Sequence, residues 1–394
     1  MNKPKRLILK PGKEESLNRF HPWIFSGAIQ KMENQPQEGD LVEVYNAEGR
    51  YMAVGHYQPD SIAVRILSFA PAVIDESFWT ERIREACTFR MSIGLLNANS
   101  NVCRLVHGEG DNLPGLIIDL YGRTAVMQAH SAGMHHARKQ IAVALQNVLR
   151  ENIQSVYYKS ENTLPFKAGL AAEDGFLTGE EAEKTAMENG LKFIIDLQKG
   201  QKTGFFIDQR DNRFLLESYS RNRTVLNLFC YTGGFSVYAM RGGAQLVHSV
   251  DSSSRAITIA RSNMDMNFPD DTRHEAFAED AFRFLANAGS TYDLIILDPP
   301  AFAKRRDVLR NALQGYRKLN ATALAKIKRG GILFTFSCSQ AVTRENFRLS
   351  VFSAAAQAGR RVRIIHQLSQ PADHPVNIYH PEGEYLKGLV LHVE

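Results

Sequence analysis

Three aspartates and one cysteine stand where short apolar segments end, and these four residues could carry chemistry. If the segments are neighbouring parallel strands, their carboxyl ends share one edge of a sheet, where open α/β sheets bind ligands. The pattern therefore predicts one site that combines carboxylates with a thiol. The four residues are Asp251, Asp280, Asp298 and Cys338.

Asp298 shows this pattern most clearly. It follows the mainly apolar run 292–297, which is typical of a buried central strand, and it precedes Pro299 and Pro300. Prolines fix the direction of the following loop and remove backbone donors from it. The alternative is an ordinary strand end whose aspartate caps a helix.

A glycine pair in the segment 227–236 marks the turn between an expected strand and its helix, where the backbone can approach a ligand closely. The segment lacks the full G-x-G-x-x-G pattern of dinucleotide sites. A shorter, aromatic-flanked loop suits S-adenosylmethionine, which has no pyrophosphate to be held. Cys230 is expected only to line this loop. The cofactor candidates here are Phe229, Tyr231, Thr232, Gly233 and Gly234.

Asp251 comes 18 positions after Gly233 (251 minus 233), close to the separation at which an acidic residue binds ribose hydroxyls. Capping of the next helix is the alternative, but the serines at 252–254 could do that, which favours ribose binding. Asp280 could bind the adenine amino group or could be only a cap. The cofactor candidates at the strand ends are Asp251, Ser252, Asp280, Ala281 and Asp298.

Cys338 comes 40 positions after Asp298 (338 minus 298) and is expected at the same edge. Buried cysteines are usually inert, but this one has polar neighbours and lies beside the expected methyl donor. A thiolate in this place could act as a covalent nucleophile, and an acid such as Asp298 could bind or protonate a substrate ring. Phe302 or the pair Phe205-Phe206 could stack on that ring.

The elements that must position these residues alternate strand and helix from residue 224 onward, which predicts a mainly parallel sheet with crossover helices. Seven strands, the last two forming a hairpin, are the layout of the Rossmann-like class I methyltransferase domain. The expected strands are 225–229, 246–251, 275–278, 294–297, 332–337, 363–366 and 389–392.

The residues before this domain predict two smaller units. The first 70 or so alternate short strands with turns, as in a small β-barrel, and Trp23 and Phe25 are expected in its core, with neighbouring Lys and Arg facing RNA. A helix over 74–96 follows, in which Cys87 fills the core. The expected strands 102–106, 116–120, 124–129 and 155–159 and the helix 134–150 complete an α+β unit, and Asn189-Gly190 predicts a hairpin before the last domain.

Composition excludes a disordered or fibrous chain: 44% of the 394 residues are hydrophobic and 23% are charged. A net charge of +5 and basic clusters, one of them at 304–306, suit a nucleic-acid partner. The four cysteines show no metal-binding spacing, and no segment resembles a secretion signal or a membrane span. We therefore expect a cytoplasmic protein with reduced thiols and no metal.

Five strings taken in order resemble the PUA-domain-containing cytosine-5 methyltransferases of bacterial 23S ribosomal RNA, and the resemblance runs through essentially the whole chain. The ordered set is highly specific, although each string alone is weak. The strings are 21–27 (HPWIFSG), 201–213, 227–236, 297–304 and 337–339 (SCS).

The resemblance implies a PUA barrel, a middle domain described as EEHEE, and a C-terminal S-adenosylmethionine domain. It assigns the nucleophile to Cys338 and the D-P-P motif to Asp298, Pro299 and Pro300. It also implies that 201–213 forms part of the active-site wall. This chain has no cysteine in its D-P-P-A-F loop, unlike the other large group of RNA cytosine-5 methyltransferases, whose second cysteine there assists product release.

We therefore expect three domains, 1–72, 73–185 and 186–394, and methyl transfer to C5 of a cytosine in 23S ribosomal RNA, naked or in an assembling large subunit, by a protein that could form a homodimer. One alternative is an N-methyltransferase of rRNA or tRNA on the same fold, for which no thiol is needed. Another is a non-catalytic RNA-binding ribosome-assembly factor. The candidate RNA-contacting residues are Pro299, Pro300, Phe302, Lys304, Arg305, Phe205, Phe206, Gln209 and Arg210.

Overall fold

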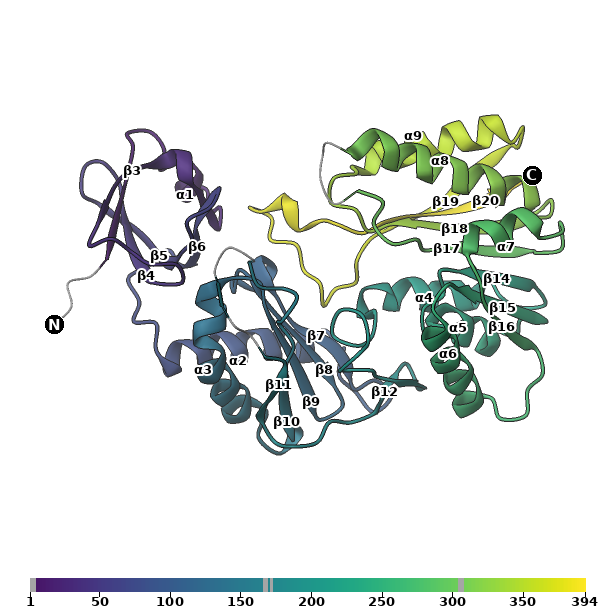
Figure 1. The fold of residues 1–394 in the computed structure, drawn as a ribbon, viewed down its shortest axis with the longest axis horizontal. Helices are drawn as coiled ribbons and strands as arrows, with labels where there is room; N and C mark the ends of the chain where they lie inside the picture. Colours follow the sequence, from purple (N-terminus) through teal and green to yellow (C-terminus); the bar gives the residue numbers. More distant parts are fainter. Residues whose placement is uncertain (1–4, 166–168, 171–172, 304–307) are drawn as a thin grey trace. The chain divides into compact units, whose positions relative to one another are not determined.

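The computed structural model describes residues 5–165, 169–170, 173–303 and 308–394 (Figure 1). The chain divides into two compact units. The N-terminal unit comprises Met1–Met187, Ile195–Ile207 and Ala372–Gly383, and the C-terminal unit comprises Glu188–Ile194, Asp208–Pro371 and Glu384–Glu394. No helix in the described ranges is long and apolar enough to cross a membrane.

The N-terminal unit begins with a six-stranded sheet in the order β2-β6-β5-β4-β1-β3, with β1 parallel to β4. Alternating apolar residues of these strands form its core, for example Leu7 and Leu9 on β1 and Val42 and Val44 on β4, all buried. The strands are β1 (Arg6–Leu9), β2 (Trp23–Phe25), β3 (Ile29–Glu33), β4 (Leu41–Tyr45), β5 (Tyr51–Tyr57) and β6 (Ile62–Ser68), with the short helix α1 (Glu15–Asn18).

The expectation that Trp23 and Phe25 lie in this core is wrong. Ile24 between them is buried, whereas Phe25 is 48% exposed and Trp23 is only partly buried. Successive side chains of a strand point to opposite faces, so Ile24 faces the core while Trp23 and Phe25 face away from it. Trp23 Nε1 instead donates a hydrogen bond to Glu109 Oε1 at 2.8 Å.

A five-stranded sheet in the order β11-β10-β9-β8-β7 forms the second part of this unit, with two helices packed together. Trp79, Ile83 and Cys87 of α2 are buried, as expected for Cys87, but Met91 is 63% exposed. Each step of four residues overshoots a helical turn by about 40°, which carries Met91 off the buried face. The elements are α2 (Glu76–Ser92), β7 (Val102–His107), β8 (Leu116–Tyr121), β9 (Thr124–Ala129), α3 (Ala132–Leu149), β10 (Ser155–Tyr158) and β11 (Gly175–Thr178).

The hairpin at Asn189-Gly190 is confirmed: it joins β12 (Thr185–Glu188) to β13 (Leu191–Ile194). Both turn residues have positive φ, 50° and 80°, as a two-residue turn that matches strand twist requires.

The C-terminal unit contains a seven-stranded sheet in the order β16-β15-β14-β17-β18-β20-β19. The first five strands are parallel, and β20 runs antiparallel to both its neighbours, which confirms the expected fold class. The strands are β14 (Thr224–Leu228), β15 (Leu246–Asp251), β16 (His274–Ala278), β17 (Leu294–Leu297), β18 (Gly331–Ser337), β19 (Val362–Leu368) and β20 (Lys387–Val393).

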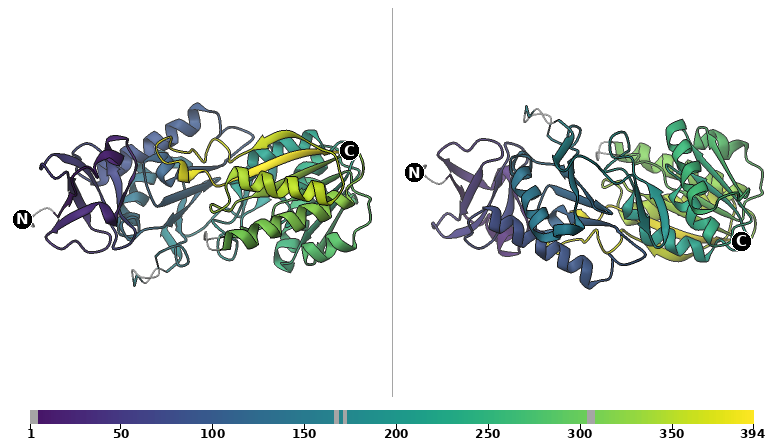
Figure 2. Two further views of the ribbon diagram at one scale, coloured as in Figure 1. Left: turned by 90° about the horizontal axis from the view of Figure 1, so that it is seen from above. Right: turned by 90° about the horizontal axis from the view of Figure 1, so that it is seen from below.

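Helices cover both faces of this sheet, α4, α5 and α6 on one side and α7, α8 and α9 on the other (Figure 1). Figure 2 shows α8 and α9 lying side by side. All four residues of β17 are fully buried, because a central parallel strand is covered on both faces and therefore has a continuous apolar sequence. The helices are α4 (Arg210–Ser218), α5 (Gly234–Arg241), α6 (Ser254–Asn267), α7 (Ala281–Asn287), α8 (Leu309–Lys326) and α9 (Arg344–Gln357).

Candidate active site

The carboxyl ends of β14, β15, β17 and β18 meet at one edge of the seven-stranded sheet. Leu297 pairs with Leu228 on one side and with Thr335 on the other, so the three strands end at nearly the same level. β14 has β15 as its neighbour on one side and β17 on the other, so the strand order reverses direction at β14. Such a reversal of strand order opens a crevice where ligands bind.

The loop after β14 has an unusual backbone that brings it close to this crevice. Phe229, Tyr231 and Gly233 have positive φ of 58°, 49° and 80°. Gly233 precedes α5, and a Cβ there would lie 3.0 Å from the Ala260 Cβ, so both conformation and space favour glycine. Thr232 Oγ1 is buried and has no hydrogen-bond partner among the described residues. A bound cofactor could satisfy this hydroxyl.

Asp251 supports the same loop from the end of β15. Its Oδ2 accepts a hydrogen bond from the Tyr231 N–H and its Oδ1 accepts one from the Ser253 N–H, each at 2.9 Å. Ser253, not Asp251, caps α6, since its side chain accepts from the Ala256 N–H. Each carboxylate oxygen can accept more than one hydrogen bond, so Asp251 can also bind ribose hydroxyls. Ser252 beside it is exposed.

Asp280 behaves differently, because here the capping alternative is observed. Its Oδ1 accepts a hydrogen bond at 2.8 Å from the N–H of Arg283 in the first turn of α7. Ala281, the next residue, is buried. Contact of Asp280 with adenine stays a prediction.

The loop after β17 places Asp298, partly buried, between the buried Leu297 and the buried Pro299. Phe302 packs on Tyr316 of α8 with 4.6 Å between ring centroids, and its ring lies 6.3 Å from that of Phe282. Phe282 in turn meets Phe229 edge-on at 5.9 Å. An aromatic row therefore runs from the glycine loop to the loop of Asp298.

Cys338 is the only one of the four cysteines that is not buried. Its Sγ lies 4.0 Å from the Pro299 carbonyl oxygen, which brings the thiol next to the loop of Asp298. Cys230, in contrast, is buried, and burial together with the charge of Asp251 raises the pKa of its thiol well above the ordinary value. Cys338 is the thiol that a substrate could reach.

Two further residues at this edge were missed by sequence reasoning. Tyr316 is fully buried and accepts a hydrogen bond from Ser337 Oγ at 2.9 Å. Burial, with the nearby Cys338 and Asp298, raises the pKa of Tyr316 to about 12, so its hydroxyl is neutral. The second residue is Lys387, whose Nζ donates to the Ser339 carbonyl oxygen at 2.7 Å. A lysine at the start of the apolar strand β20 is the signal that could have identified it.

The described members of the expected RNA-contacting set belong to both units. Phe205 is buried, and its carbonyl oxygen accepts from the Tyr121 hydroxyl at 3.4 Å, while Lys202 Nζ lies 4.3 Å from the ring centroid of the partly exposed Phe206. Both phenylalanines belong to the N-terminal unit. Lys304 and Arg305 lie outside the described residues.

Gln209 and Arg210 belong to the C-terminal unit and are buried. Gln209 Oε1 accepts from Asn212 Nδ2 at 2.6 Å, and Arg210 Nε lies 3.6 Å from Glu188 Oε2. Both side chains are therefore engaged within their own unit, and a contact with substrate stays a prediction.

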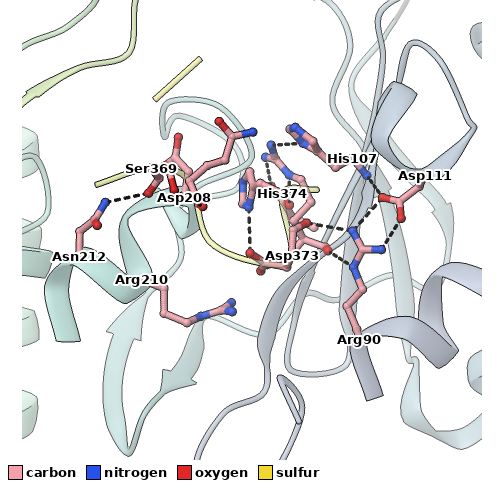
Figure 3. A network of polar contacts seen from close by, with 12 residues as sticks. Arg90, His107, Asp111, Asp208, Arg210, Asn212, Ser369, Asp373 and His374 are labelled. Carbon is pink, nitrogen blue, oxygen red and sulfur yellow. Dashed lines mark hydrogen bonds and ion pairs between the residues drawn. The ribbon is translucent and has the colours of Figure 1, made fainter. Parts of the chain in front are cut away.

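Figure 3 shows polar contacts that hold the segment Ala372–Gly383 within the N-terminal unit. Arg90 Nη2 donates to Asp111 Oδ2 at 2.8 Å and to the Asp373 carbonyl oxygen at 2.9 Å. His374 Nδ1 lies 2.9 Å from Asp373 Oδ1. Arg90, Asp373 and His374 are buried and hydrogen-bonded, so they have a structural role. Within the described ranges, no three His, Cys, Asp or Glu side chains are placed to hold a metal ion.

Comparison with protein families agrees with this geometry. The family model of S-adenosylmethionine-dependent methyltransferases matches residues 166–384, and the model of PUA-like domains matches residues 7–69. Fold and site thus define a methyltransferase that uses S-adenosylmethionine and carries a PUA-like domain. The expected cofactor is confirmed.

Comparison with individual proteins identifies the family more narrowly. The chain is 40% identical over 395 residues to Ribosomal RNA large subunit methyltransferase I of Escherichia coli (strain SMS-3-5 / SECEC), covering 98% of this chain and 99% of that protein. It belongs to this family, as the five strings predicted.

Solved structures support the fold alone. A methyltransferase complexed with SAH has a TM-score of 0.84 at 23% identity, and an S-adenosylmethionine-dependent methyltransferase from Streptococcus mutans has a TM-score of 0.83 at 23% identity. Each match covers 98% of this chain and 99% of the other.

Proposed function

We propose that this protein transfers a methyl group from S-adenosylmethionine to C5 of a cytosine in 23S ribosomal RNA, through a covalent bond between Cys338 Sγ and C6. One observation carries the proposal: the accessible thiol lies beside the loop of Asp298, 4.0 Å from the Pro299 carbonyl oxygen. The name of the relatives, ribosomal RNA large subunit methyltransferase I, supports rRNA as the substrate.

S-adenosylmethionine supplies an electrophilic methyl group on a sulfonium. Asp251 and Thr232 fit the cofactor, the first through ribose hydroxyls and the second through its buried hydroxyl. The other cofactor contacts assigned to the glycine loop and to Ser252, Asp280, Ala281 and Asp298 form part of the same proposal.

The reaction needs a nucleophile that adds to the ring and later leaves it. Cys338 Sγ bonds to C6, and the electron pair of the C5–C6 double bond makes C5 nucleophilic enough to take the methyl group. A base, which can be a water molecule, then takes the C5 proton; the electron pair of that C–H bond restores the C5–C6 double bond, and the thiolate leaves C6. Asp298 in its protonated form holds the ring while this happens: its O–H donates to N3 and can protonate it, and its other oxygen accepts from the exocyclic amine.

The rest of the chain would bring the RNA to this edge. We assign residues 1–72 to an RNA-binding barrel, 73–185 to the middle domain and 186–394 to the methyltransferase domain. Phe302, Phe206 and the basic residues Lys304 and Arg305 are proposed to contact the RNA, and the partner is 23S ribosomal RNA, naked or in an assembling large subunit. Unpaired bases suit such contacts, because a flipped base can stack on an aromatic ring.

Replacing Cys338 with alanine tests the proposal. Cys338→Ala should abolish 5-methylcytosine in 23S rRNA while calorimetry shows unchanged binding of S-adenosylmethionine. Full methylation at a ring or exocyclic nitrogen by the variant would instead support the N-methyltransferase alternative. No transfer of a labelled methyl group to RNA by the wild type would support the non-catalytic alternative.

A further inference from the structure

Lys387 is a buried cation at the edge of the sheet that carries Cys338. It is the first residue of β20, is 3% exposed, and pairs in antiparallel register with Ser337, the last residue of β18. Cys338 is the next residue along the chain. The register of these two strands therefore brings the lysine to the level of the thiol.

The contacts of the Lys387 ammonium group point toward the turn of Cys338. Nζ donates a hydrogen bond to the Ser339 carbonyl oxygen at 2.7 Å, directly after the cysteine. An ammonium group has three donors, so further N–H groups remain to interact with an anion at this position. The hydrogen bond holds the backbone on one side of the thiol.

A buried lysine normally needs a carboxylate partner, and Lys387 has none within ion-pair distance among the described residues. Glu384, the nearest acidic influence, makes its own ion pair with Arg344. Burial lowers the pKa of Lys387 to about 8. Electrostatic attraction, first to Cys338 and then to Glu384, acts in the opposite direction and raises this pKa. The thiol is thus the leading electrostatic partner of this ammonium group.

Tyr316 and Asp298 also lie near Cys338. Tyr316 on α8 is neutral, and Asp298 after β17 is acidic. Arg344 on α9 is occupied by Glu384. Lys387 is a buried cation placed to stabilise a negative charge on Sγ.

We propose that Lys387 is a positioning residue for Cys338: it fixes the Ser337–Ser339 turn and its charge favours the thiolate over the thiol. This inference rests on the proposed function, because a thiolate is needed here only if Cys338 is the nucleophile. The thiol loses its proton to solvent, and the ammonium group keeps its own, so no other reactant is required. A cation close to a cysteine favours the reactive thiolate in general.

The rate of alkylation of Cys338 by iodoacetamide measures this effect without RNA or cofactor. The rate is followed at a series of pH values by mass spectrometry of the peptide that contains Cys338. We expect Lys387→Gln, which keeps a donor for Ser339, and Lys387→Met to shift the midpoint of the pH profile upward by about one unit. The rate near neutral pH should then fall about tenfold.

Two control variants separate charge from packing. Lys387→Arg keeps the charge and should keep the wild-type midpoint, and Lys328→Met, which removes a surface lysine paired with Asp293, should also leave it unchanged. A wild-type midpoint in either neutral variant, in a protein that unfolds at or above the wild-type temperature, would overturn the proposal. An equal upward shift in Lys387→Arg would overturn it as well. If Cys338→Ala methylates RNA normally, the proposed function fails, but the alkylation result still reports on Lys387.

Discussion

Two cysteines follow strands of the same sheet, and their surroundings differ in every respect that matters for reactivity. Cys230 follows β14 and is buried against Ile257 and Ala276, and its thiol donates to the Tyr231 carbonyl oxygen at 3.5 Å. Cys338 follows β18, is partly exposed and lies near Lys387. The position at a strand end is therefore not sufficient for a reactive thiol. Exposure and a neighbouring cation distinguish the two sites.

The first prediction concerns the alkylation rates of the two thiols in the wild type. Cys338 should react with iodoacetamide at least about a thousandfold faster than Cys230, because burial raises the pKa of Cys230 and blocks access. Quantitative mass spectrometry of the two peptides measures both rates in one sample. Similar rates would remove the distinction on which the proposed nucleophile depends.

The second prediction tests the acid beside the thiol. Asp298→Asn should lower kcat for RNA methylation about a hundredfold to a thousandfold, since a group that binds the reacting ring is lost. The affinity for S-adenosylmethionine should change much less. Steady-state kinetics with labelled methyl donor, together with calorimetry, separates the two effects. A variant with wild-type kcat would exclude Asp298 from the reaction.

The third prediction concerns the cofactor side of the crevice, near Cys230. Asp251→Ala should weaken binding of S-adenosylmethionine about tenfold to a hundredfold, because a charged hydrogen-bond acceptor for ribose is removed and the support of the Tyr231 N–H is lost. Asp280→Ala is the matched variant and removes a helix cap. Calorimetry should show a larger loss for Asp251, and an unchanged affinity in Asp251→Ala would contradict the ribose assignment.

The smallest expected effect is on stability. The pKa of Lys387 is lowered to about 8 in the folded protein, so the unfolded chain binds more protons between this value and the ordinary pKa. Burial of the ammonium group therefore costs stability at pH 7, and this cost disappears as the pH rises above the ordinary value for lysine.

Lys387→Met should consequently raise the free energy of unfolding at pH 7, by on the order of 1 kcal/mol after the loss of the hydrogen bond to Ser339. Urea denaturation at pH 7 and in alkaline solution measures the gain, which should shrink as the pH rises. If Lys387→Met is less stable than the wild type at pH 7, and this deficit decreases at lower pH, the lowered pKa of Lys387 is contradicted.

Much of the fold could be predicted because its strands are apolar runs of defined length. The ranges 246–251 and 294–297 agree with β15 and β17 to the residue, so the place of Asp251 at the end of β15 and of Asp298 directly after β17 was predicted correctly. The exposure of Phe25 could not be predicted, because two aromatic residues on one face of a strand look the same whether that face is buried or not.

The site was less predictable where it depends on tertiary neighbours. Tyr316 lies on a helix and resembles any core residue until its contact with Phe302 is known. Lys387 approaches the turn of Cys338 only through the antiparallel pairing of β18 with β20, which joins residues 50 positions apart (387 minus 337). The spacing of residues in the sequence does not show which strands pair, so this approach could not be predicted.

RNA that contains 5-fluorocytidine can trap the proposed covalent bond between Cys338 and the cytosine ring. Fluorine at C5 cannot leave as a proton does, so the adduct cannot resolve after methyl transfer. We expect a stable protein–RNA complex that forms with S-adenosylmethionine, maps to Cys338, and is absent in Cys338→Ala but present in Cys230→Ser. Methylation of ordinary RNA without any trapped complex at Cys338 would exclude Cys338 as the nucleophile.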